Sequence, residues 1–439
     1  MAEGKIPPPK SNFRRERCHG TQKREGWTQD AMRGASVIRF GEFRVMCVSE
    51  FFSVAGEQFS RVALALLTFD RTGSAAITGM TYGLTYLPNV LGSLTLSVVG
   101  DRKPRRTVII VIDAVRALAV AAMALPGMPL VVVCALVAMV SFLNGPYKAT
   151  QLAFLRDVLD AEHYSAGMAV RQCVSQIGLL VGFAAGGVIS STSPQLCFAI
   201  NAMTFTASAF SIGVLVRSRP VSTALQARSS LFDGLRIVWG SRGSRAIFVS
   251  TLTGVFLIAP EGAAAAYVDE LGAKSEWVGF LLAGVAASSI VGLALFTRVV
   301  PYHRLPIAFP VVCLATGAPL PCVLLPVGPY LAGVIFGLSG ALWTIQVTMS
   351  VSFLAEMLPD DRRAQGMGVA ASMNFTASGV GAVLVGVVAQ ATSATSTIAL
   401  AGVASMAFAL WPCTIWARRE KGASHGDKKP LHQEVAGIQ

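Results

Sequence analysis

The feature that most constrains this chain is a series of apolar stretches, each long enough to cross a lipid bilayer. Residues 107–125 and 128–143 are two examples. A transmembrane helix needs about 20 predominantly apolar residues. The whole sequence is 53% hydrophobic and only 14% charged, whereas soluble domains carry about 25% charged residues. We therefore predict an all-α membrane protein, because helices satisfy their own backbone hydrogen bonds in lipid.

Apolar segments of this kind recur along almost the entire chain. We predict twelve transmembrane helices, with boundaries that are less well determined than the segments themselves. They lie at residues 45–69, 74–99, 107–125, 128–154, 166–190, 195–216, 245–268, 276–298, 305–325, 328–356, 364–390 and 394–416.

The placement of basic residues predicts how these helices are oriented. With the N-terminus inside the cell, 30 of the 36 Lys and Arg residues fall in cytoplasmic segments. Only Arg71 and Lys274 fall in outer loops. Basic residues are retained on the cytoplasmic side, so we expect both termini to be cytoplasmic. The same distribution accounts for the net charge of +12 without a nucleic-acid partner.

An internal repeat divides the chain into two halves. At an offset of 199 residues, 154–170 aligns with 353–369, and Gly167-Met168 aligns with Gly366-Met367. The register continues to Gly187 and Gly386. This offset spans six helices, and parallel repeats of six helices are one of the known transporter architectures.

We therefore predict two six-helix bundles with substrate bound between them near the bilayer midplane. The bundles and the segments around them have these bounds. Residues 1–43 form a basic cytoplasmic tail that we expect to be disordered, 44–216 the N-terminal bundle, 217–244 a cytoplasmic loop, 245–416 the C-terminal bundle and 417–439 a cytoplasmic tail.

Several short motifs resemble the major facilitator superfamily, in its macrolide-efflux and enterobactin-exporter branch of drug:proton antiporters. The resemblance covers about 43–416. The matching residues are Gly56-Glu57-Gln58, Thr72-Gly73-Ser74, Pro88, Asp101-Arg102 followed by Arg105-Arg106, Asp113 with Arg116, Pro146 and Tyr267-Val268-Asp269. The resemblance implies the major facilitator fold and export driven by a proton gradient.

Ionisable residues inside the predicted spans are candidates for proton coupling or for the central cavity, because each is costly to insert into a membrane. Glu57 lies near the middle of the first span, and Arg61 follows it by one helical turn. The alternative is a static ion pair between them. Glu261, between Pro260 and Gly262, is the strongest carboxylate candidate of the second half, unless it lies at the outer interface. Lys148 either contacts an anionic substrate or snorkels.

A second group of residues is predicted to form an inner gate. The resemblance implies that Asp101 meets the start of the eleventh span near 364–366. We expect Arg102, Arg105 and Arg106 to pair with carboxylates of the inner loops, such as Asp157 or Glu356. The alternative is that these basic residues only enforce orientation. Asp113 and Arg116 are three residues apart, so they share a helix face and are expected to pair.

The sequence contains no signature of catalysis. It lacks the G-x-x-x-x-G-K-[ST] and H-E-x-x-H motifs, and its five His residues lie in tails or loops. We therefore expect no enzyme activity, no cofactor and no metal. The expected partners are a small-molecule substrate, protons and the lipid bilayer, with no nucleic acid, and the expected state is a monomer in the bacterial cytoplasmic membrane.

The leading functional hypothesis is proton-coupled efflux of a hydrophobic or amphipathic small molecule, such as a drug, antibiotic or secondary metabolite. The alternatives of the same fold are a siderophore exporter and an uptake permease. An alternative of another class is a membrane sensor or partner-binding protein that does not transport.

Overall fold

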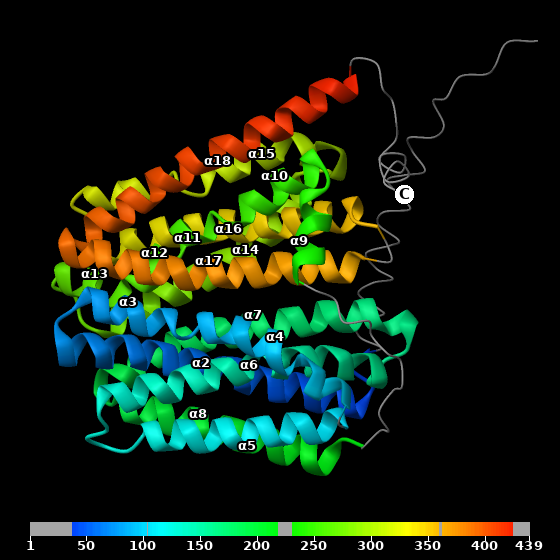
Figure 1. Cartoon of the computed structure of the whole chain (residues 1–439). Helices are drawn as coiled ribbons and strands as arrows, with labels where there is room; N and C mark the ends of the chain where they lie inside the picture. Colours follow the sequence, from blue (N-terminus) through cyan, green and yellow to red (C-terminus); the bar gives the residue numbers. More distant parts are fainter. Residues whose placement is uncertain (1–36, 103, 218–230, 360–361, 425–439) are drawn as a thin grey trace, which may run out of the picture.

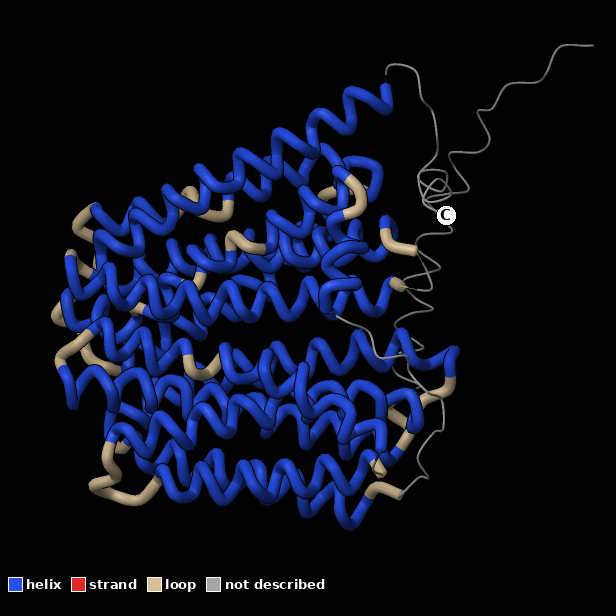
Figure 2. Tube along the Cα trace, in the orientation of Figure 1, coloured by secondary structure: helices blue, strands red, loops and turns tan. Residues whose placement is uncertain are grey.

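The computed structural model describes residues 37–102, 104–217, 231–359 and 362–424. In these ranges the chain forms helices joined by short turns, and it forms no strand (Figure 2). The all-helical prediction is therefore confirmed for the part of the chain that the structure describes. The start of α2 and the end of α18 lie at the same end of the bundle (Figure 1).

The helices fall into an N-terminal half (α2–α8) and a C-terminal half (α9–α18). The N-terminal half contains α2 Gly41–Thr72, α3 Ala75–Gly83, α4 Leu87–Arg102, α5 Arg105–Met123, α6 Leu130–Val158, α7 Ala161–Thr192 and α8 Pro194–Leu215. The C-terminal half contains α9 Leu231–Trp239, α10 Arg242–Thr251, α11 Gly254–Leu257, α12 Ala259–Gly262, α13 Ala264–Glu270, α14 Glu276–Val299, η1 Tyr302–Arg304, α15 Leu305–Ala315, η2 Leu320–Leu324, α16 Pro329–Met357, α17 Arg363–Ala391 and α18 Ala394–Ser424.

Each predicted span coincides with helical structure, but the second, the seventh and the ninth are interrupted. The ninth is divided into α15 and η2. A turn at 84–86 separates α3 from α4, and Pro88 follows within the first turn of α4, where its missing N–H is tolerated. The seventh span is divided into α10, α11, α12 and α13, with Pro260 in the first turn of α12. The interruption of the seventh span places the candidate Glu261 in irregular backbone inside the bundle.

Nine helical segments of the described chain are long and apolar enough to cross a membrane. They correspond to the fourth through twelfth predicted spans. The first three predicted spans are not among them. Whether these three also cross the bilayer stays a prediction.

The helix boundaries reproduce the internal repeat. Helix α6 covers Leu130–Val158 and α16 covers Pro329–Met357, so both ends are offset by the same 199 residues that relate the sequences. The loop glycines are equivalent as well. A Cβ on Gly167 would lie 2.2 Å from Leu159, and one on Gly366 would lie 2.5 Å from Leu358. Each loop therefore closes by packing a leucine on a glycine.

The two halves meet through pairs of glycines. A Cβ on Gly79 of α3 would lie 2.6 Å from the Cα of Gly386 in α17, and one on Gly187 of α7 would lie 2.6 Å from the Cα of Gly279 in α14. These are backbone-to-backbone approaches that only small residues allow. Gly187 and Gly386 are the repeat-related positions, so the two contacts are related by the pseudo-symmetry.

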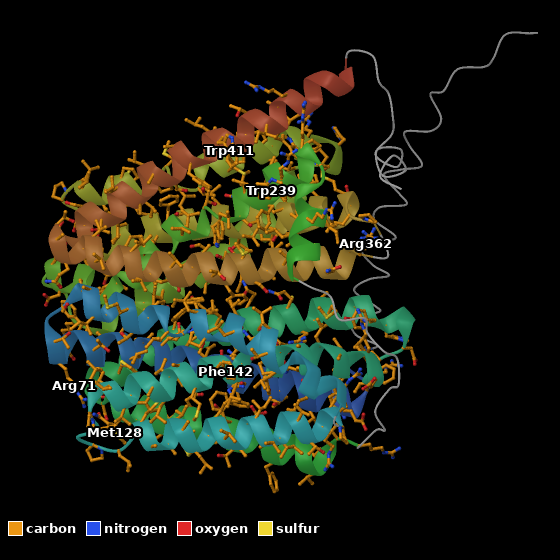
Figure 3. All side chains as sticks on the ribbon, viewed as in Figure 1. Arg71, Met128, Phe142, Trp239, Arg362 and Trp411 are labelled. Atoms are coloured by element: carbon orange, nitrogen blue, oxygen red, sulfur yellow. The ribbon has the colours of Figure 1, made fainter. Side chains whose placement is uncertain are left out.

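Both glycine contacts lie toward one end of the bundle. Arg71 donates a hydrogen bond of 2.7 Å to the carbonyl of Met128 at this end, and Arg362 lies at the opposite end (Figure 3). Following the predicted orientation, we call the end with Arg71 the outer end and the end with Arg362 the inner end.

The segment 217–244, predicted as a loop, contains α9. This short helix packs on α17, because a Cβ on Gly234 would lie 2.4 Å from Val369. The apolar spacing of Leu231, Leu235 and Val238 is helical and was the available signal. The rest of this segment up to residue 230 lies partly outside the described residues.

Candidate functional site

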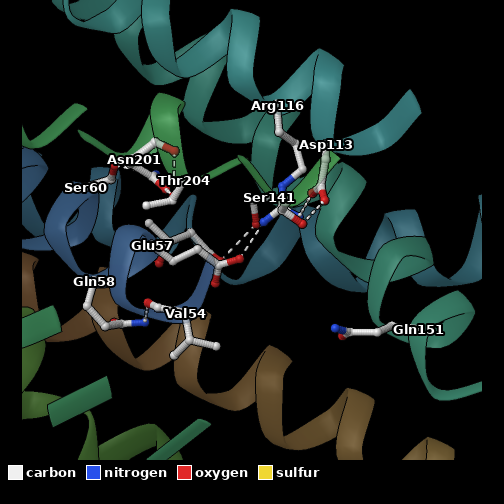
Figure 4. A network of polar contacts seen from close by, with 12 residues as sticks. Val54, Glu57, Gln58, Ser60, Asp113, Arg116, Ser141, Gln151, Asn201 and Thr204 are labelled. Atoms are coloured by element: carbon white, nitrogen blue, oxygen red, sulfur yellow. Dashed lines mark hydrogen bonds and ion pairs between the residues drawn. The ribbon is translucent and has the colours of Figure 1, made fainter. Parts of the chain in front are cut away.

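An ion-pair network lies inside the N-terminal half and contains three of the predicted residues. Arg116 of α5 is 0% exposed, and its Nη2 lies 2.5 Å from Oε1 of Glu57 in α2. Its Nη1 lies 3.3 Å from Oδ1 of Asp113, one turn earlier on the same helix. The predicted Asp113–Arg116 pair is therefore present, and Glu57 joins it from another helix (Figure 4).

Hydroxyl groups and aromatic rings hold this network in place. Ser208 of α8 donates to Oδ2 of Asp113 at 2.6 Å, and Ser49 of α2 lies 2.5 Å from the Ser208 hydroxyl. The guanidinium carbon of Arg116 lies 4.7 Å from the ring centroid of Tyr147 and 4.0 Å from that of Phe205. The charge is thus enclosed by opposite charges and by ring faces that attract cations.

Arg61 is not the ionic partner of Glu57, which corrects the predicted pair. Instead, Arg61 donates a hydrogen bond of 3.1 Å to the hydroxyl of Tyr86, and its guanidinium lies 4.8 Å from that ring centroid. A pair one turn apart on a helix contributes only about 0.2–0.5 kcal/mol. Arg116 is fully buried and has no access to water, so its ion pair with Glu57 is more favourable than a pair between Glu57 and Arg61.

Glu261 accepts hydrogen bonds from two tyrosines of the other half. The hydroxyl of Tyr82 in α3 lies 2.9 Å from its Oε2, and that of Tyr86, in the turn before α4, lies 3.2 Å from the same oxygen. Tyr86 therefore links Arg61 to Glu261. The carboxylate of Glu261 therefore lies at the contact between the two halves. Its role in proton coupling or in the central cavity stays a prediction.

Lys148 of α6 also faces the opposite half. Its side chain is exposed, and its ammonium nitrogen lies 5.8 Å from the ring centroid of Phe375 in α17. Among the described residues, no carboxylate lies within ion-pair distance of Lys148.

Two of the predicted inner-gate arginines contact their own half. Arg105 forms an ion pair of 2.7 Å with Asp157 at the inner end of α6, which is one of the predicted partners. Arg106 donates to the carbonyls of Ile212 and Gly213 in α8. The side chains of Asp101 and Arg102 lie outside the described residues. The gate role of all four residues stays a prediction.

Sequence reasoning missed a second ion pair inside the N-terminal half, which is partly buried. Arg171 of α7 bonds to Glu50 of α2 and donates at 2.9 Å to Gln151 of α6. Ser175 donates to the other oxygen of Glu50 at 2.6 Å. The signal was available, because a cation and a carboxylate in two different predicted spans must each find a partner.

A pocket opens beside Glu57 within the N-terminal half. Its empty volume is about 470 Å³, part of which is open to solvent. Its walls come from α2, the turn between α3 and α4, α5, α6 and α8. The lining residues are Glu57, Ser60, Arg61, Leu64, Thr85, Val120, Met123, Val137, Val140, Ser141, Asn144 and Asn201.

Comparison with known families and structures agrees with this architecture. A family model described as Major Facilitator Superfamily matches residues 46–351. No curated protein matches the chain. The solved structure of a peptide transporter POT in complex with sulfate is 13% identical, with a TM-score of 0.69 over 89% of this chain and 98% of that chain.

Two further solved structures are similar. A bacterial homologue of the human lysosomal transporter Spinster, in an inward-facing and occupied conformation, is 11% identical, with a TM-score of 0.69 over 86% of this chain and 96% of that chain. The nucleoside transporter NupG is 14% identical, with a TM-score of 0.65 over 85% of this chain and 99% of that chain. At these identities the likeness shows a common fold.

Proposed function

The chain belongs to the Major Facilitator Superfamily, and from this premise we propose that it is a proton-coupled exporter of a hydrophobic or amphipathic small molecule. Membership and fold make it a multi-pass membrane protein and a secondary transporter, not an enzyme. The proton coupling, the export direction and the bacterial cytoplasmic membrane as its location are the proposal.

The observation that carries the proposal is the charge of the Glu57–Arg116–Asp113 network. Two carboxylates share one guanidinium, so the network has one negative charge in excess. Excess charge in a low-dielectric interior is costly, and a bound proton removes it. Asp113 is fully buried, whereas the Glu57 side chain is 14% exposed and lines the pocket. Glu57 is therefore the carboxylate that a proton can reach.

The proposal includes a topology and a conformational state. We propose twelve crossings in two bundles, 44–216 and 245–416, with both termini in the cytoplasm. The distribution of basic residues supports this orientation. The glycine contacts between halves lie at the outer end, which supports an inward-facing state, and a similar solved structure is described as inward-facing.

The test is a susceptibility profile of bacterial cells that express the chain, measured over a panel of uncharged and amphipathic antibiotics. We expect the inhibitory concentration of at least one compound to rise and a protonophore to abolish the rise. Glu57→Gln should remove the protection, because it cannot release a proton. The matched control is Asp160→Asn, an exposed carboxylate between α6 and α7, which should protect fully.

Two results would contradict the proposal. Protection that survives the protonophore would remove proton coupling. Full protection by Glu57→Gln would assign Glu57 a structural role and make Glu261 the next candidate.

A further inference from the structure

The charged residues of the outer end are confined to two turns and the helix ends beside them. They are Asp70, Arg71, Asp269, Glu270, Lys274 and Glu276. The other four turns at this end contain no Asp, Glu, Lys, Arg or His, and they are 124–129, 190–195, 324–329 and 390–395. The two charged turns are related by the internal repeat, because Asp70 and Asp269 are separated by 199 residues.

Asp70 and Asp269 occupy equivalent places at the ends of α2 and α13. Each lies three residues before a glycine in the left-handed conformation, Gly73 with φ 59° and Gly272 with φ 61°. Both carboxylates therefore lie at a helix C-terminus, where the helix dipole disfavours negative charge. A proton on either carboxylate relieves this unfavourable interaction.

The closed outer end brings these two positions together from opposite halves. Helix α13 packs against α2, and both reach the outer end of the bundle (Figure 1). Phe69 and Val268, the residues directly before Asp70 and Asp269, belong to the same apolar cluster. Both carboxylates lie outside the predicted spans. Partial burial and the charge of Asp269 raise the pKa of Asp70 above its usual value, as expected for like charges near each other.

No cation among the described residues neutralises this pair. Arg71 follows Asp70 directly, but it donates its hydrogen bond to the carbonyl of Met128. The ion pairs between described residues do not include Asp70, Asp269 or Lys274. The negative charges of the two aspartates are therefore opposed to each other without a local counter-charge.

The other acidic residues of the outer end do not form such a pair. Glu270 accepts hydrogen bonds from N–H groups at the start of α18, including that of Thr395 at 2.9 Å. Glu276 lies in the first turn of α14, where the helix dipole stabilises its charge. At the repeat offset, Glu270 corresponds to Arg71 and Glu276 to Ile77. Nearby tyrosine hydroxyls titrate near pH 10 and stay neutral in the carboxylate range.

We propose that Asp70 and Asp269 form a proton-sensitive latch at the outer end. When both are ionised, their repulsion opposes the approach of the two halves. A proton taken up from outside removes the repulsion, so acidification increases the closed, inward-facing population. The latch goes beyond the proposed coupling at Glu57, because it gives external pH a separate effect on the conformation.

The test measures how far the halves separate as the pH changes. Spin labels at Thr192 and Ser275 report this distance in the full chain, with native cysteines replaced, in lipid nanodiscs. All measurements use the Glu57→Gln background, so that the proposed coupling carboxylate does not titrate. Between about pH 7.5 and about pH 4.5, we expect the open population to fall about two- to fivefold, the range for an exposed pair of charges.

Neutral variants test whether the two aspartates cause this response. Asp70→Asn combined with Asp269→Asn should be as closed at the higher pH as the parent is at the lower pH, and should not respond further. Glu276→Gln removes another outer carboxylate and should keep the response of the parent. A full response in the double variant, or an equal loss of response in Glu276→Gln, would overturn the proposal.

Charge reversal separates repulsion from a loss of packing. Asp70→Lys places a cation beside Asp269, so the outer end should be more closed than in the parent at the higher pH. It should open as Asp269 becomes protonated, which reverses the sign of the response. An unreversed response would overturn the proposal. The labels need neither substrate nor a proton gradient, so failure of the latch and failure of proton-coupled export are observed separately.

Discussion

Tyr82 of α3 donates a hydrogen bond of 2.9 Å to Glu261 of α12, and this contact joins the two halves. Tyr82 is 1% exposed, so its hydroxyl has no alternative partner in water. Tyr86 donates to the same carboxylate oxygen at 3.2 Å. Because a carboxylate is a strong acceptor, the two tyrosines stabilise the approach of α3 to the C-terminal half.

Removing both hydroxyls should therefore weaken closure of the outer end. A hydrogen bond to a charged group contributes about 1.5–3 kcal/mol, so Tyr82→Phe with Tyr86→Phe should increase the outward-open population at least tenfold. Spin labels at Thr192, the last residue of α7, and Lys274, just before α14, report the separation of the halves. We expect a longer-distance population to grow. The control is Tyr330→Phe, which is 79% exposed, and an unchanged distance distribution in the double variant would exclude a closing role.

Arg116 should be essential for stability. Replacing it by Met leaves Glu57 and Asp113 buried without a cation, and removing one partner of a buried ion pair costs about 3–5 kcal/mol. We expect Arg116→Met to lower the thermal midpoint of the purified protein strongly. Combining it with Glu57→Gln and Asp113→Asn should recover much of the loss, because the buried charges are then gone. No recovery in the triple variant would show that the rings around Arg116, rather than its charge, stabilise the bundle.

The helices were predictable because their signal is local. Apolar runs of spanning length and the offset of 199 residues depend only on neighbouring residues or on comparison of the chain with itself. The partner of Glu57 was not predictable in this way. Arg61 is near in sequence, whereas Arg116 is brought close only by the packing of the N-terminal half.

The contact between Glu261 and the tyrosines was missed for a related reason. A search for charged residues inside spans finds Glu261 but passes over Tyr82 and Tyr86, whose hydroxyls are uncharged. Asn144 and Asn201 were missed likewise, since uncharged amides are less costly in a membrane. Pocket walls combine residues from several helices, and one sequence does not show which helices are neighbours.

The orientation in the membrane can be checked with single cysteines in a background that lacks the eight native ones. Asp160→Cys lies between α6 and α7, and Ser275→Cys lies before α14. With both termini inside, a membrane-impermeant maleimide added to intact cells should label position 275 and not position 160. Lysed cells, in which both positions should react, provide the control. The reverse pattern in intact cells would contradict the proposed orientation.

The close contacts between glycines should be what allows the two halves to meet at the outer end, so a larger residue there should hold the halves apart. A Cβ on Gly279 of α14 would lie 2.3 Å from the Cα of Gly187 in α7, so Gly279→Ala must push two backbones apart. Gly284→Ala on the same helix is the matched control, because its Cβ would lie 3.8 Å from the nearest atom, an ordinary contact. We expect only Gly279→Ala to increase labelling of Thr192→Cys by an external impermeant reagent and to slow transport. Gly386→Ala should act in the same way, because Gly386 is the repeat-related counterpart of Gly187 and a Cβ there would lie 2.8 Å from the Cα of Gly79. Equal labelling of the Gly279→Ala and Gly284→Ala variants would mean that the halves adjust without opening, and that the glycines serve packing alone.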